Sequence, residues 1–474
     1  MKKTCTLLLL CTLSLSSGLF AQYRQDIAPK VVLEFNVGTP ISTFRSVPVQ
    51  LNASGGTGIL IAYTEKPAGG SPSSEFFTLP QGTLSLVMFD LTGKQLWRRE
   101  LGRNVIPNTN FVPVLPFDLD GDGVEEVWYI DNSDPELPLK TTAFIVQSLD
   151  ANTGKAMRSF PWPTTTKSQP MGNLFRNFLL GTYAGGKPIL VTGQGTYQYG
   201  PMALTGYDSN LKRIWRTDIP VGAPGPRGSH MSAIADMDMD GDDDILWGER
   251  CIRARDGKIL FMPEGYTGHS DIVQPVMDWE NKRWNLYCCR ENGETPRLVY
   301  MDNQGKTIWS DLEGHVDKGW VARFTENGEW ICTALEIGRK YKEGREVIRE
   351  NQKEFAYQLA TGEPIELPFK GATSAKPIDF NGDGIHELYY KNQIRDVRGN
   401  QSRINGSVSH VSHFMDYPGE QIITHTSDGT IRVWANAEGG PDSPQATRRY
   451  EHPFYKRNQK LTAVSANDDN LSGL

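Results

Sequence analysis

Three acidic segments of the sequence carry oxygen-bearing side chains at one repeated spacing. Each has Asp or Asn at positions one, three and five, Gly at position six, and Asp or Glu at position nine. The three sets are Asp118, Asp120, Asp122 and Glu126; Asp236, Asp238, Asp240 and Asp244; and Asp379, Asn381, Asp383 and Glu387. Hard oxygen ligands on a tight loop suit Ca²⁺, which takes about six to eight of them. The spacing therefore predicts calcium-binding loops of the DxDGDG type.

These loops are expected to hold a structural cation. Without a cation, several carboxylates within a few ångströms would repel one another, whereas a bound ion would fix the loop. Two alternatives are a catalytic metal and a solvated acidic turn that binds no ion. The middle loop has Met239 at position four, where the other two have Gly121 and Gly382, so we expect weaker binding there.

A second group of candidate ligands contains histidine. The chain has 8 histidines, and none of them precedes His230. His230 lies just upstream of the middle acidic loop, and His269, Asp271 and Glu291 follow it along the chain. Two imidazoles and two carboxylates from neighbouring elements can form a cation site that differs from the acidic loops. The alternative is that each histidine is a hydrogen-bonded core or surface residue.

Repeated β-hairpin signals indicate which elements position these residues. An apolar strand, a turn of Asp, Asn, Thr, Gly and Lys, and a second strand recur along the chain. The turns begin at Asp90, Asp150, Asp208, Asp256 and Asp302, at intervals of 60, 58, 48 and 46 residues. This spacing predicts one four-stranded blade per repeat, and such blades bury their faces by closing into a ring. With no helical periodicity between the strands, residues 22–474 are expected to form an all-β, single β-propeller of seven or eight blades.

The N-terminus has the pattern of a secretory signal peptide over residues 1–21, with Lys2 and Lys3, an apolar run and small residues up to Ala21. We therefore expect a secreted or periplasmic protein, with attachment to the outer surface left open. A membrane anchor and lipid modification at Cys11 are alternatives, although the apolar run is shorter than the roughly 20 residues of a membrane span.

Composition excludes several classes of partner and leaves the cysteines as core residues. Without Lys2 and Lys3 the chain has 47 basic and 56 acidic residues, which is not the footprint of a nucleic-acid-binding protein. We expect no membrane span and a monomer. The four cysteines after residue 21 are predicted to be buried rather than paired in a disulfide framework; they are Cys251, Cys288, Cys289 and Cys332.

The order of several motifs resembles a known family. The segments "GSHMSAIADMDMDGDDDILWG", "GHSD", "GHVDKGWVARF", "DFNGDGIHELYYKNQI" and "HVSHFMDYPGEQIITHTSDGTIRVWANAE" follow one another between Gly228 and Tyr455. They look like the later blades of the rhamnogalacturonan lyases of polysaccharide lyase family 11, which are calcium-dependent eight-bladed propellers that cut the pectin backbone. Residues from Tyr23 to Pro226 show the propeller rhythm but little of the family's sequence, so the resemblance implies a divergent member.

The resemblance also implies roles for individual residues. It places His230, His269, Asp271 and Glu291 around a calcium ion in a central cleft. Lys318 stands where the family has an arginine near the substrate. Lys391 is the nearest counterpart of a family lysine proposed as the base, with Gln393 matched by a looser alignment. These departures leave open whether catalysis is retained, and the alternative for each lysine is an exposed, solvated side chain.

The function implied is that of a secreted, calcium-dependent polysaccharide lyase, a carbon–oxygen lyase acting by β-elimination. Its partner would be an acidic polysaccharide, with the backbone of rhamnogalacturonan I-type pectin as the first choice. Removal of the proton at C5 builds negative charge next to a carboxylate, so the site needs positive charge there. Calcium would supply it as a Lewis acid, and Lys318 and Lys391 would be the base and the carboxylate clamp.

Two other functions remain open from the sequence. The first is a non-catalytic propeller that binds a glycan or a protein and uses calcium only as scaffold. The second is a lyase of the same mechanism that acts on another uronate polymer. Neither the polymer nor endo or exo action can be read from the sequence. The first of these alternatives would be favoured if His230 and His269 lay far apart or were walled off from solvent.

Overall fold

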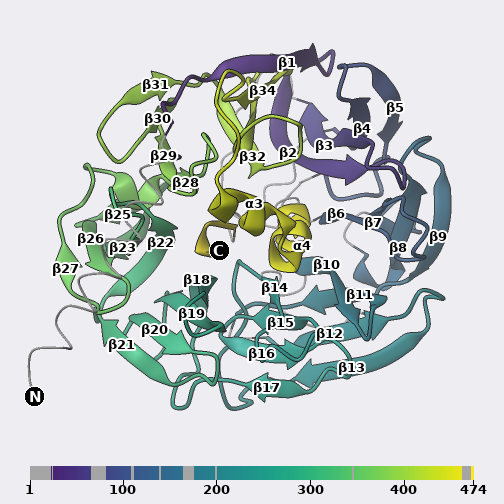
Figure 1. Cartoon of the computed structure of the whole chain (residues 1–474). Helices are drawn as coiled ribbons and strands as arrows, with labels where there is room; N and C mark the ends of the chain where they lie inside the picture. The colour runs from purple at the N-terminus through teal and green to yellow at the C-terminus, as the bar shows by residue number, and fades with distance from the viewer. Residues whose placement is uncertain are drawn as a thin grey trace, which may run out of the picture.

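The computed structural model describes residues 23, 25–65, 82–107, 112–137, 140–163, 176–197, 200–343, 346–461 and 471–474. The predicted signal peptide, residues 1–21, lies outside the described residues. The described chain forms eight four-stranded antiparallel sheets arranged in a ring (Figure 1). The predicted β-propeller is therefore confirmed, and the number of blades is eight.

The blades follow one another along the chain, each with its first strand innermost (Figure 1). The first four contain β2 (Ile41–Gln50), β3 (Thr57–Glu65), β4 (Leu84–Asp90) and β5 (Gln95–Glu100); β6 (Val114–Phe117), β7 (Glu126–Asn132), β8 (Phe144–Asp150) and β9 (Ala156–Pro161); β10 (Asn177–Ala184), β11 (Lys187–Gln194), β12 (Met202–Tyr207) and β13 (Arg213–Ile219); and β14 (Ile234–Ala235), β15 (Asp244–Trp247), β16 (Arg250–Arg253) and β17 (Ile259–Phe261).

The other four blades complete the ring. They contain β18 (Ser270–Asp278), β19 (Arg283–Arg290), β20 (Leu298–Asp302) and β21 (Thr307–Asp311); β22 (His315–Arg323), β23 (Trp330–Ile337), β26 (Lys353–Gln358) and β27 (Pro364–Ile365); β28 (Lys376–Ile378), β29 (Glu387–Tyr390), β30 (Gln393–Arg395) and β31 (Gln401–Arg403); and β32 (Ser407–Ser412), β33 (Gln421–His425), β34 (Thr430–Ala435) and β1 (Lys30–Asn36). The last blade joins the two ends of the chain, because β1 pairs antiparallel with β34 from Lys30 opposite Ala435 to Asn36 opposite Thr430.

The predicted hairpin turns lie between the third and fourth strands of the blades. At the first of them, Asp90 accepts hydrogen bonds at Oδ1 from the backbone N–H groups of Thr92 (2.9 Å) and Lys94 (3.0 Å). Gly93 has a φ of +84°, a conformation that glycine adopts without a steric penalty. Asp208 and Asp302 accept the equivalent bonds in later blades. The turn residues thus determine the hairpins locally.

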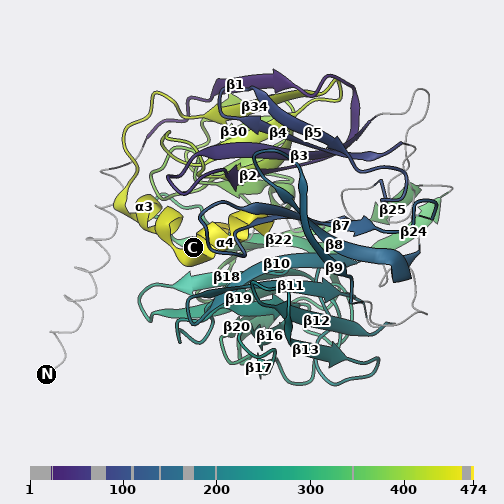
Figure 2. The ribbon, with the colours of Figure 1, turned by 90° about the vertical axis from the view of Figure 1, so that its right-hand side faces the viewer.

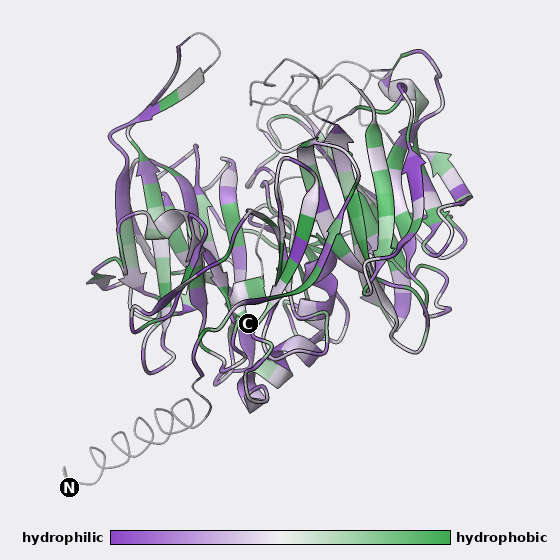
Figure 3. Cartoon of the chain, turned by 90° about the horizontal axis from the view of Figure 1, so that it is seen from above, coloured by the Kyte–Doolittle hydropathy of each residue, from purple (hydrophilic) through white to green (hydrophobic). Residues whose placement is uncertain are grey.

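Apolar side chains fill the space between blades. Strand β4 is typical, since Leu84, Leu86, Val87 and Met88 are all fully buried. Figure 3 shows the apolar stretches running along the strands, with polar residues concentrated in the loops. The cysteines Cys251, Cys288, Cys289 and Cys332 are free and buried, as predicted. They act as small apolar residues of this core.

Two short helices after the last blade were not predicted. They are α3 (Pro444–Glu451) and α4 (Pro453–Leu461), and they lie over the centre of the ring in Figure 1. A helix-start signal was present, because the Ser443 side chain accepts a hydrogen bond from the N–H of Ala446 (3.1 Å) and Pro444 follows it. Short 3-10 turns occur at Thr141–Ala143, Ala372–Ser374 and Leu471–Gly473. Within the described residues, neither helix has the length or the apolar character to cross a bilayer.

One further hairpin departs from the four-stranded plan. Strands β24 (Arg339–Glu343) and β25 (Glu346–Glu350) form a separate two-stranded sheet between β23 and β26 of the sixth blade. Figure 2 shows this hairpin on one face of the ring and helices α3 and α4 on the other. The two faces therefore carry different additions to the propeller.

Candidate metal centre

The four residues predicted to form a histidine-containing metal site come together in the structure. Asp271 Oδ1 lies 3.2 Å from His269 Nε2 and 3.6 Å from His230 Nε2. Glu291 Oε2 lies 3.8 Å from His269 Nε2. His230, His269 and Asp271 each offer one ligand atom, and these atoms all lie within 4.8 Å of one another. This geometry is compatible with coordination of a single cation.

Neighbouring blades position these side chains through backbone contacts. His269 immediately precedes β18, Asp271 belongs to it, and Glu291 directly follows β19. The N–H of Glu291 donates to the carbonyl of His269 (3.0 Å). An isolated parallel bridge joins Ser229 to Ser270, and so ties the segment that carries His230 to the start of β18. All four residues therefore lie at the end of the ring where the inner strands begin.

The hydrogen bonds of His269 leave one ring nitrogen facing a carboxylate. Nδ1 of this fully buried residue lies 2.6 Å from the carbonyl oxygen of Gly228, which can only accept, so Nδ1 carries the proton. In the neutral ring Nε2 then presents a lone pair toward Asp271 Oδ1, and both atoms are buried without a hydrogen-bond partner. Two lone pairs face each other at this distance when a cation or a proton lies between them. The donor set fits a bound metal ion.

Electrostatics at the site favour a cation. Burial lowers the pKa of His269 to about 4, so its ring is neutral at pH 7 and able to bind a metal. Burial first, and then the charges of Glu291 and Asp317, raise the pKa of Asp271 well above its usual range. A positive ion among these carboxylates would offset the repulsion.

The structure adds two residues that were not predicted as ligands, His315 and Asp317. His315 Nε2 lies 2.9 Å from Asp317 Oδ1 and 3.7 Å from Glu291 Oε1. A signal was present in the sequence, because "GHVD" at 314–317 repeats "GHSD" at 268–271. The two segments occupy the same position in consecutive blades, at the starts of β22 and β18. Equivalent positions of adjacent blades lie side by side in a propeller, so this repeat extends the site.

The cluster is open to solvent on one side. The side chains of His230 and Glu291 are each 19% exposed and that of His315 is 25% exposed, whereas that of His269 is fully buried. The Tyr197 hydroxyl lies 3.0 Å from His230 Nε2. The cluster is therefore neither scattered nor walled off, which were the two outcomes expected of a propeller without a metal centre here.

The inserted hairpin reaches this cluster. Arg349 on β25 forms an ion pair with Asp317, with Nη2 3.0 Å from Oδ2. The pKa of His230 is lowered mainly by burial and then by the neighbouring His269. The positive charges of Arg176 and of Lys340, which lies on the hairpin, lower it further. Positive side chains thus lie beside the carboxylates and imidazoles.

The two predicted catalytic lysines are both exposed. Lys318 follows Asp317 on β22, and Lys391 lies at the turn between β29 and β30 with a φ of +48°. The Lys391 ammonium lies 5.0 Å from the centre of the Tyr390 ring. In the described part of the chain, no ion pair or hydrogen bond connects either ammonium to the cluster. Their catalytic roles stay predictions.

The three acidic loops lie at the opposite end of the inner strands. They connect β6 to β7, β14 to β15 and β28 to β29. Each uses the same local hydrogen bond, from the N–H of position two to the carboxylate of position nine: Leu119 to Glu126, Met237 to Asp244 and Phe380 to Glu387, all at 2.9 Å. Helix α4 contacts this end, since Lys460 Nζ lies 2.8 Å from Glu125 Oε2. The loops are therefore distant from the histidine cluster in the fold.

Two of the loops gather oxygen ligands as predicted. In the first, Asp118, Asp120 and Asp122 offer oxygens within 4.8 Å of one another, and in the second Asp236, Asp238 and Asp244 do so. The predicted weakness of the second has a backbone counterpart, because Met239 takes a φ of +61° where Gly121 takes +79°. A side chain in this left-handed region costs about 1 kcal/mol or more relative to glycine.

The third loop differs from the other two in its burial and in the groups that contact it. Arg158 pairs with Glu126 of the first loop and Arg255 pairs with Asp240 of the second, on carboxylates at positions nine and five. Its residues Asp379, Asn381, Asp383 and Glu387 are all buried. Arg449 Nη1 of α3 lies 3.7 Å from Asp379 Oδ2, and the Tyr450 hydroxyl donates to the same oxygen at 3.1 Å. The amide of Asn381 donates to Asp383 (3.2 Å) and to Glu387 (3.0 Å). This loop is partly neutralised by the chain itself, while its predicted calcium remains a prediction.

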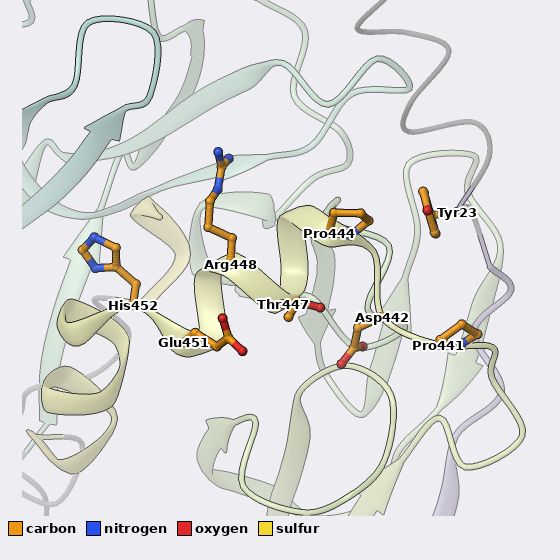
Figure 4. A pocket seen from close by; sticks show the side chains of 8 residues that line it. All are labelled: Tyr23, Pro441, Asp442, Pro444, Thr447, Arg448, Glu451 and His452. Atoms are coloured by element: carbon orange, nitrogen blue, oxygen red, sulfur yellow. The ribbon is translucent and has the colours of Figure 1, made fainter.

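A separate cavity of about 670 Å³ lies beside the C-terminal helices (Figure 4). It is lined by Tyr23, Pro441, Asp442, Pro444, Thr447, Arg448, Glu451 and His452. None of the predicted site residues belongs to it. It lies with the helices on the face opposite the inserted hairpin (Figure 2).

Comparisons with known proteins extend the sequence resemblance. Rhamnogalacturonan exolyase YesX of Bacillus subtilis (strain 168) is 27% identical over 344 residues, which are 65% of this chain and 53% of the relative. Rhamnogalacturonan endolyase YesW of the same strain is 26% identical over 280 residues, 50% of this chain and 44% of the relative. The chain thus spans about half the length of these two relatives.

Solved structures show the same propeller. The crystal structure of exotype rhamnogalacturonan lyase YesX has a TM-score of 0.73 at 18% identity, covering 92% of this chain and 80% of the other. Bacillus licheniformis rhamnogalacturonan lyase PL11 has a TM-score of 0.72 at 19% identity, covering 93% and 81%. At this identity the likeness establishes the fold.

The family match covers more than half of the 474 residues. Residues 148–405 match "Rhamnogalacturonan lyase family 11, C-terminal domain". The match begins upstream of Gly228, so residues 148–226, where little family sequence was expected, also carry the family pattern. It includes His230, His269, Asp271 and Glu291. This chain belongs to rhamnogalacturonan lyase family 11.

Proposed function

We propose that this protein is a calcium-dependent polysaccharide lyase that cleaves the uronate-containing backbone of rhamnogalacturonan I-type pectin by β-elimination. One observation carries the proposal: in a chain of this family, His269 Nε2 and Asp271 Oδ1 face each other at 3.2 Å without hydrogen-bond partners, inside a partly exposed cluster. Such a pair accommodates a cation at a position that a large ligand can approach.

The reaction needs positive charge beside a carboxylate. β-Elimination removes the proton at C5 of a uronate and expels the glycosyl oxygen from C4, which builds negative charge next to the carboxylate. When bound, Ca²⁺ would supply Lewis-acid stabilisation and orient the sugar. His230, His269, Asp271 and Glu291 would hold the ion, and His315 would orient Glu291 from the next blade.

Lys318 and Lys391 remain the candidates for the base and for a carboxylate-binding group. Both are exposed, so their ammonium groups are free to meet a polymer. Lys318 is the favoured base because it follows Asp317 directly in the strand that borders the cluster. Proton abstraction by a lysine requires its neutral form, which a cation bound nearby would favour over the charged form.

The relatives support the polymer but not the position of the cut. One is named an exolyase and the other an endolyase of rhamnogalacturonan. The segment 1–21 supports export from the cytoplasm. A pectin backbone would be met outside the cell. We therefore propose secretion together with the lyase activity.

The test is the ultraviolet absorbance of an unsaturated uronate, followed on a panel of acidic polysaccharides with and without a chelator. We expect absorbance to rise on rhamnogalacturonan with calcium present and to stop when calcium is removed. Glu291→Gln should abolish most of the activity. Glu294→Gln is the matched control, because Glu294 hydrogen-bonds Thr267 outside the cluster (2.8 Å) and should leave the rate unchanged.

Non-catalytic glycan binding is the second candidate function. It is favoured by the absence of a hydrogen bond or ion pair, in the described chain, between either lysine and the cluster. A flat absorbance trace on every polymer, together with calcium-dependent binding to one of them, would overturn the lyase proposal in favour of this one. A rise on a different uronate polymer alone would keep the mechanism and change the substrate.

A further inference from the structure

The inserted hairpin β24–β25 is the feature of the site that neither the propeller plan nor the metal ligands explain. In the portion of the chain that the structure describes, it is the one two-stranded sheet added to the four-stranded blades. Its strands lie on the face opposite helices α3 and α4, the same end at which the inner strands begin and the histidine cluster lies (Figure 2). It is therefore placed to contact whatever binds at the cluster.

Cross-strand register divides the hairpin into two faces. Lys340 pairs with Arg349, and Arg339 pairs with Glu350. Directly opposed residues share a face of a two-stranded sheet, and neighbours along a strand point to opposite faces. One face thus carries Lys340 and Arg349. The other carries Arg339 and Glu350, and Tyr341 joins it, since its hydroxyl donates to Glu350 (2.8 Å) and Arg339 stacks on its ring.

The face with Lys340 and Arg349 is turned toward the cluster. Arg349 Nη2 lies 3.0 Å from Asp317 Oδ2, and Asp317 in turn lies 2.9 Å from His315. Lys340 lies directly opposite Arg349 in the cross-strand register, on the same face of the hairpin. The hairpin face that carries these two positive side chains therefore borders the cluster at Asp317.

The charge balance of the cluster leaves one positively charged side chain for an acidic ligand. Asp271, Glu291 and Asp317 contribute three negative charges. One divalent ion together with Arg349 would neutralise them, and Lys340 would then balance the charge that the carboxylate of a uronate adds. Arg349 makes one ion pair and its side chain is still 36% exposed, so further N–H groups of its planar fork are available for a second carboxylate.

We propose that Arg349, with Lys340 beside it, binds the carboxylate of the uronate next to the metal and makes the site selective for acidic over neutral sugars. The proposal rests on the proposed function for the identity of the sugar. It assigns to the inserted hairpin a carboxylate-binding role. A purely structural role, in which Arg349 only fastens the hairpin to β22, is the competing explanation.

The test measures binding without turnover. The probe is a galacturonosyl-rhamnose disaccharide, whose uronate has no glycosyl group on O4 and so cannot undergo elimination. Its carboxyl-reduced, neutral counterpart is the paired ligand. Isothermal titration of the calcium-loaded full chain with both sugars would be compared for Arg349→Ala, Arg349→Lys and Arg339→Ala, the last being the control on the other face of the hairpin.

We expect Arg349→Ala to weaken binding of the acidic sugar about tenfold or more, as for loss of a charge-assisted hydrogen bond, with no change for the neutral sugar. Arg349→Lys should recover part of the affinity, and Arg339→Ala should stay within about twofold of the parent protein. The effect should shrink as salt is raised.

Equal losses for both sugars, or unchanged affinity for the acidic sugar in Arg349→Ala, would overturn the inference. Thermal unfolding of each variant separates misfolding from loss of the contact, and Arg349→Lys covers the case in which the alanine variant is unstable. Selective loss of acidic-sugar binding in a protein that shows no lyase activity would support the carboxylate site and reject only the proposed function. Lyase activity with unchanged binding in Arg349→Ala would support the proposed function and reject only the carboxylate site.

Discussion

Arg449→Met is predicted to destabilise the protein and to make it dependent on calcium. Arg449 is 5% exposed and lies between two buried carboxylates, with Nη2 2.9 Å from Glu420 Oε1 and Nη1 3.7 Å from Asp379 Oδ2. Removing one partner of a buried ion pair costs about 3–5 kcal/mol because the remaining charge is uncompensated. Here two carboxylates lose their partner, while the Tyr455 hydroxyl still donates to Glu420 (2.7 Å). We therefore expect a loss of about 3–5 kcal/mol in the free energy of unfolding.

Burial already raises the pKa of Asp379 well above its ordinary value. A carboxyl whose pKa is higher in the folded state stabilises the fold below its unfolded pKa and loses that contribution as the pH rises through the folded value. The stability deficit of Arg449→Met should therefore grow with increasing pH. Calcium should reduce the deficit, because the loop from Asp379 to Glu387 would then offer its carboxylates to the ion.

The assay is denaturant unfolding of both proteins at several pH values, with calcium and with a chelator. Arg448→Met is the matched control, since Arg448 stacks on Trp279 at 3.8 Å and forms no ion pair within the described residues. It should cost about 1 kcal/mol or less. The reasoning would be refuted if Arg449→Met were as stable as the parent protein, or if calcium failed to restore any of the loss.

Three further predictions follow from single contacts. Met239→Gly should relieve the positive-φ strain of the second acidic loop by about 1 kcal/mol, and so tighten its calcium binding, as measured by the calcium dependence of thermal unfolding. Ser443→Ala removes the cap of α3 and should lower the free energy of unfolding by about 1 kcal/mol, with Ser443→Asp as the rescue that must restore it. Burial lowers the pKa of His410 to about 3, so stability should fall as the pH drops from about 6.5 toward 3; His410→Gln should flatten this slope of unfolding free energy against pH, and an unchanged slope would contradict the assignment.

The site illustrates how a propeller assembles a metal centre from short local motifs. "GHSD" and "GHVD" each place a histidine and an aspartate at the start of an inner strand, two residues apart. A strand of this kind cannot enclose a cation alone. Ring closure brings the starts of neighbouring inner strands together, so that Asp271 lies near His230 of the preceding blade and Glu291 near His315 of the next.

Much of the fold followed from local chemistry and was therefore predictable. The hairpin turns depend on bonds within four residues, such as Asp90 to Thr92 and Lys94, so their spacing identified the blades. Strand alternation and the buried cysteines followed from apolar patterning. The four ligands of the candidate metal centre were also predicted, first from their residue types and order along the chain and then from the family resemblance.

The short C-terminal helices were missed because their stability depends on contacts far away in the chain. Asn458 of α4, for example, accepts a bond from the N–H of Ile234 (3.0 Å) and donates to its carbonyl (2.6 Å). Helices this short are marginal without tertiary packing. The cap at Ser443 was visible, but no local rule indicated the surface on which the helix would settle.

The sequence by itself determined the hairpin turns, the repeat of blades and the residue types able to bind cations, because each depends on neighbours along the chain. Only the tertiary structure decided which of these residues meet. The three loops share one spacing, yet each meets a different arginine at a different position: Arg158, Arg255 and Arg449. Arg349 reaches Asp317 from an inserted hairpin. The reason is physical: a turn is stabilised within a few residues, whereas a charge interacts with whatever the packed chain brings to within a few ångströms of it.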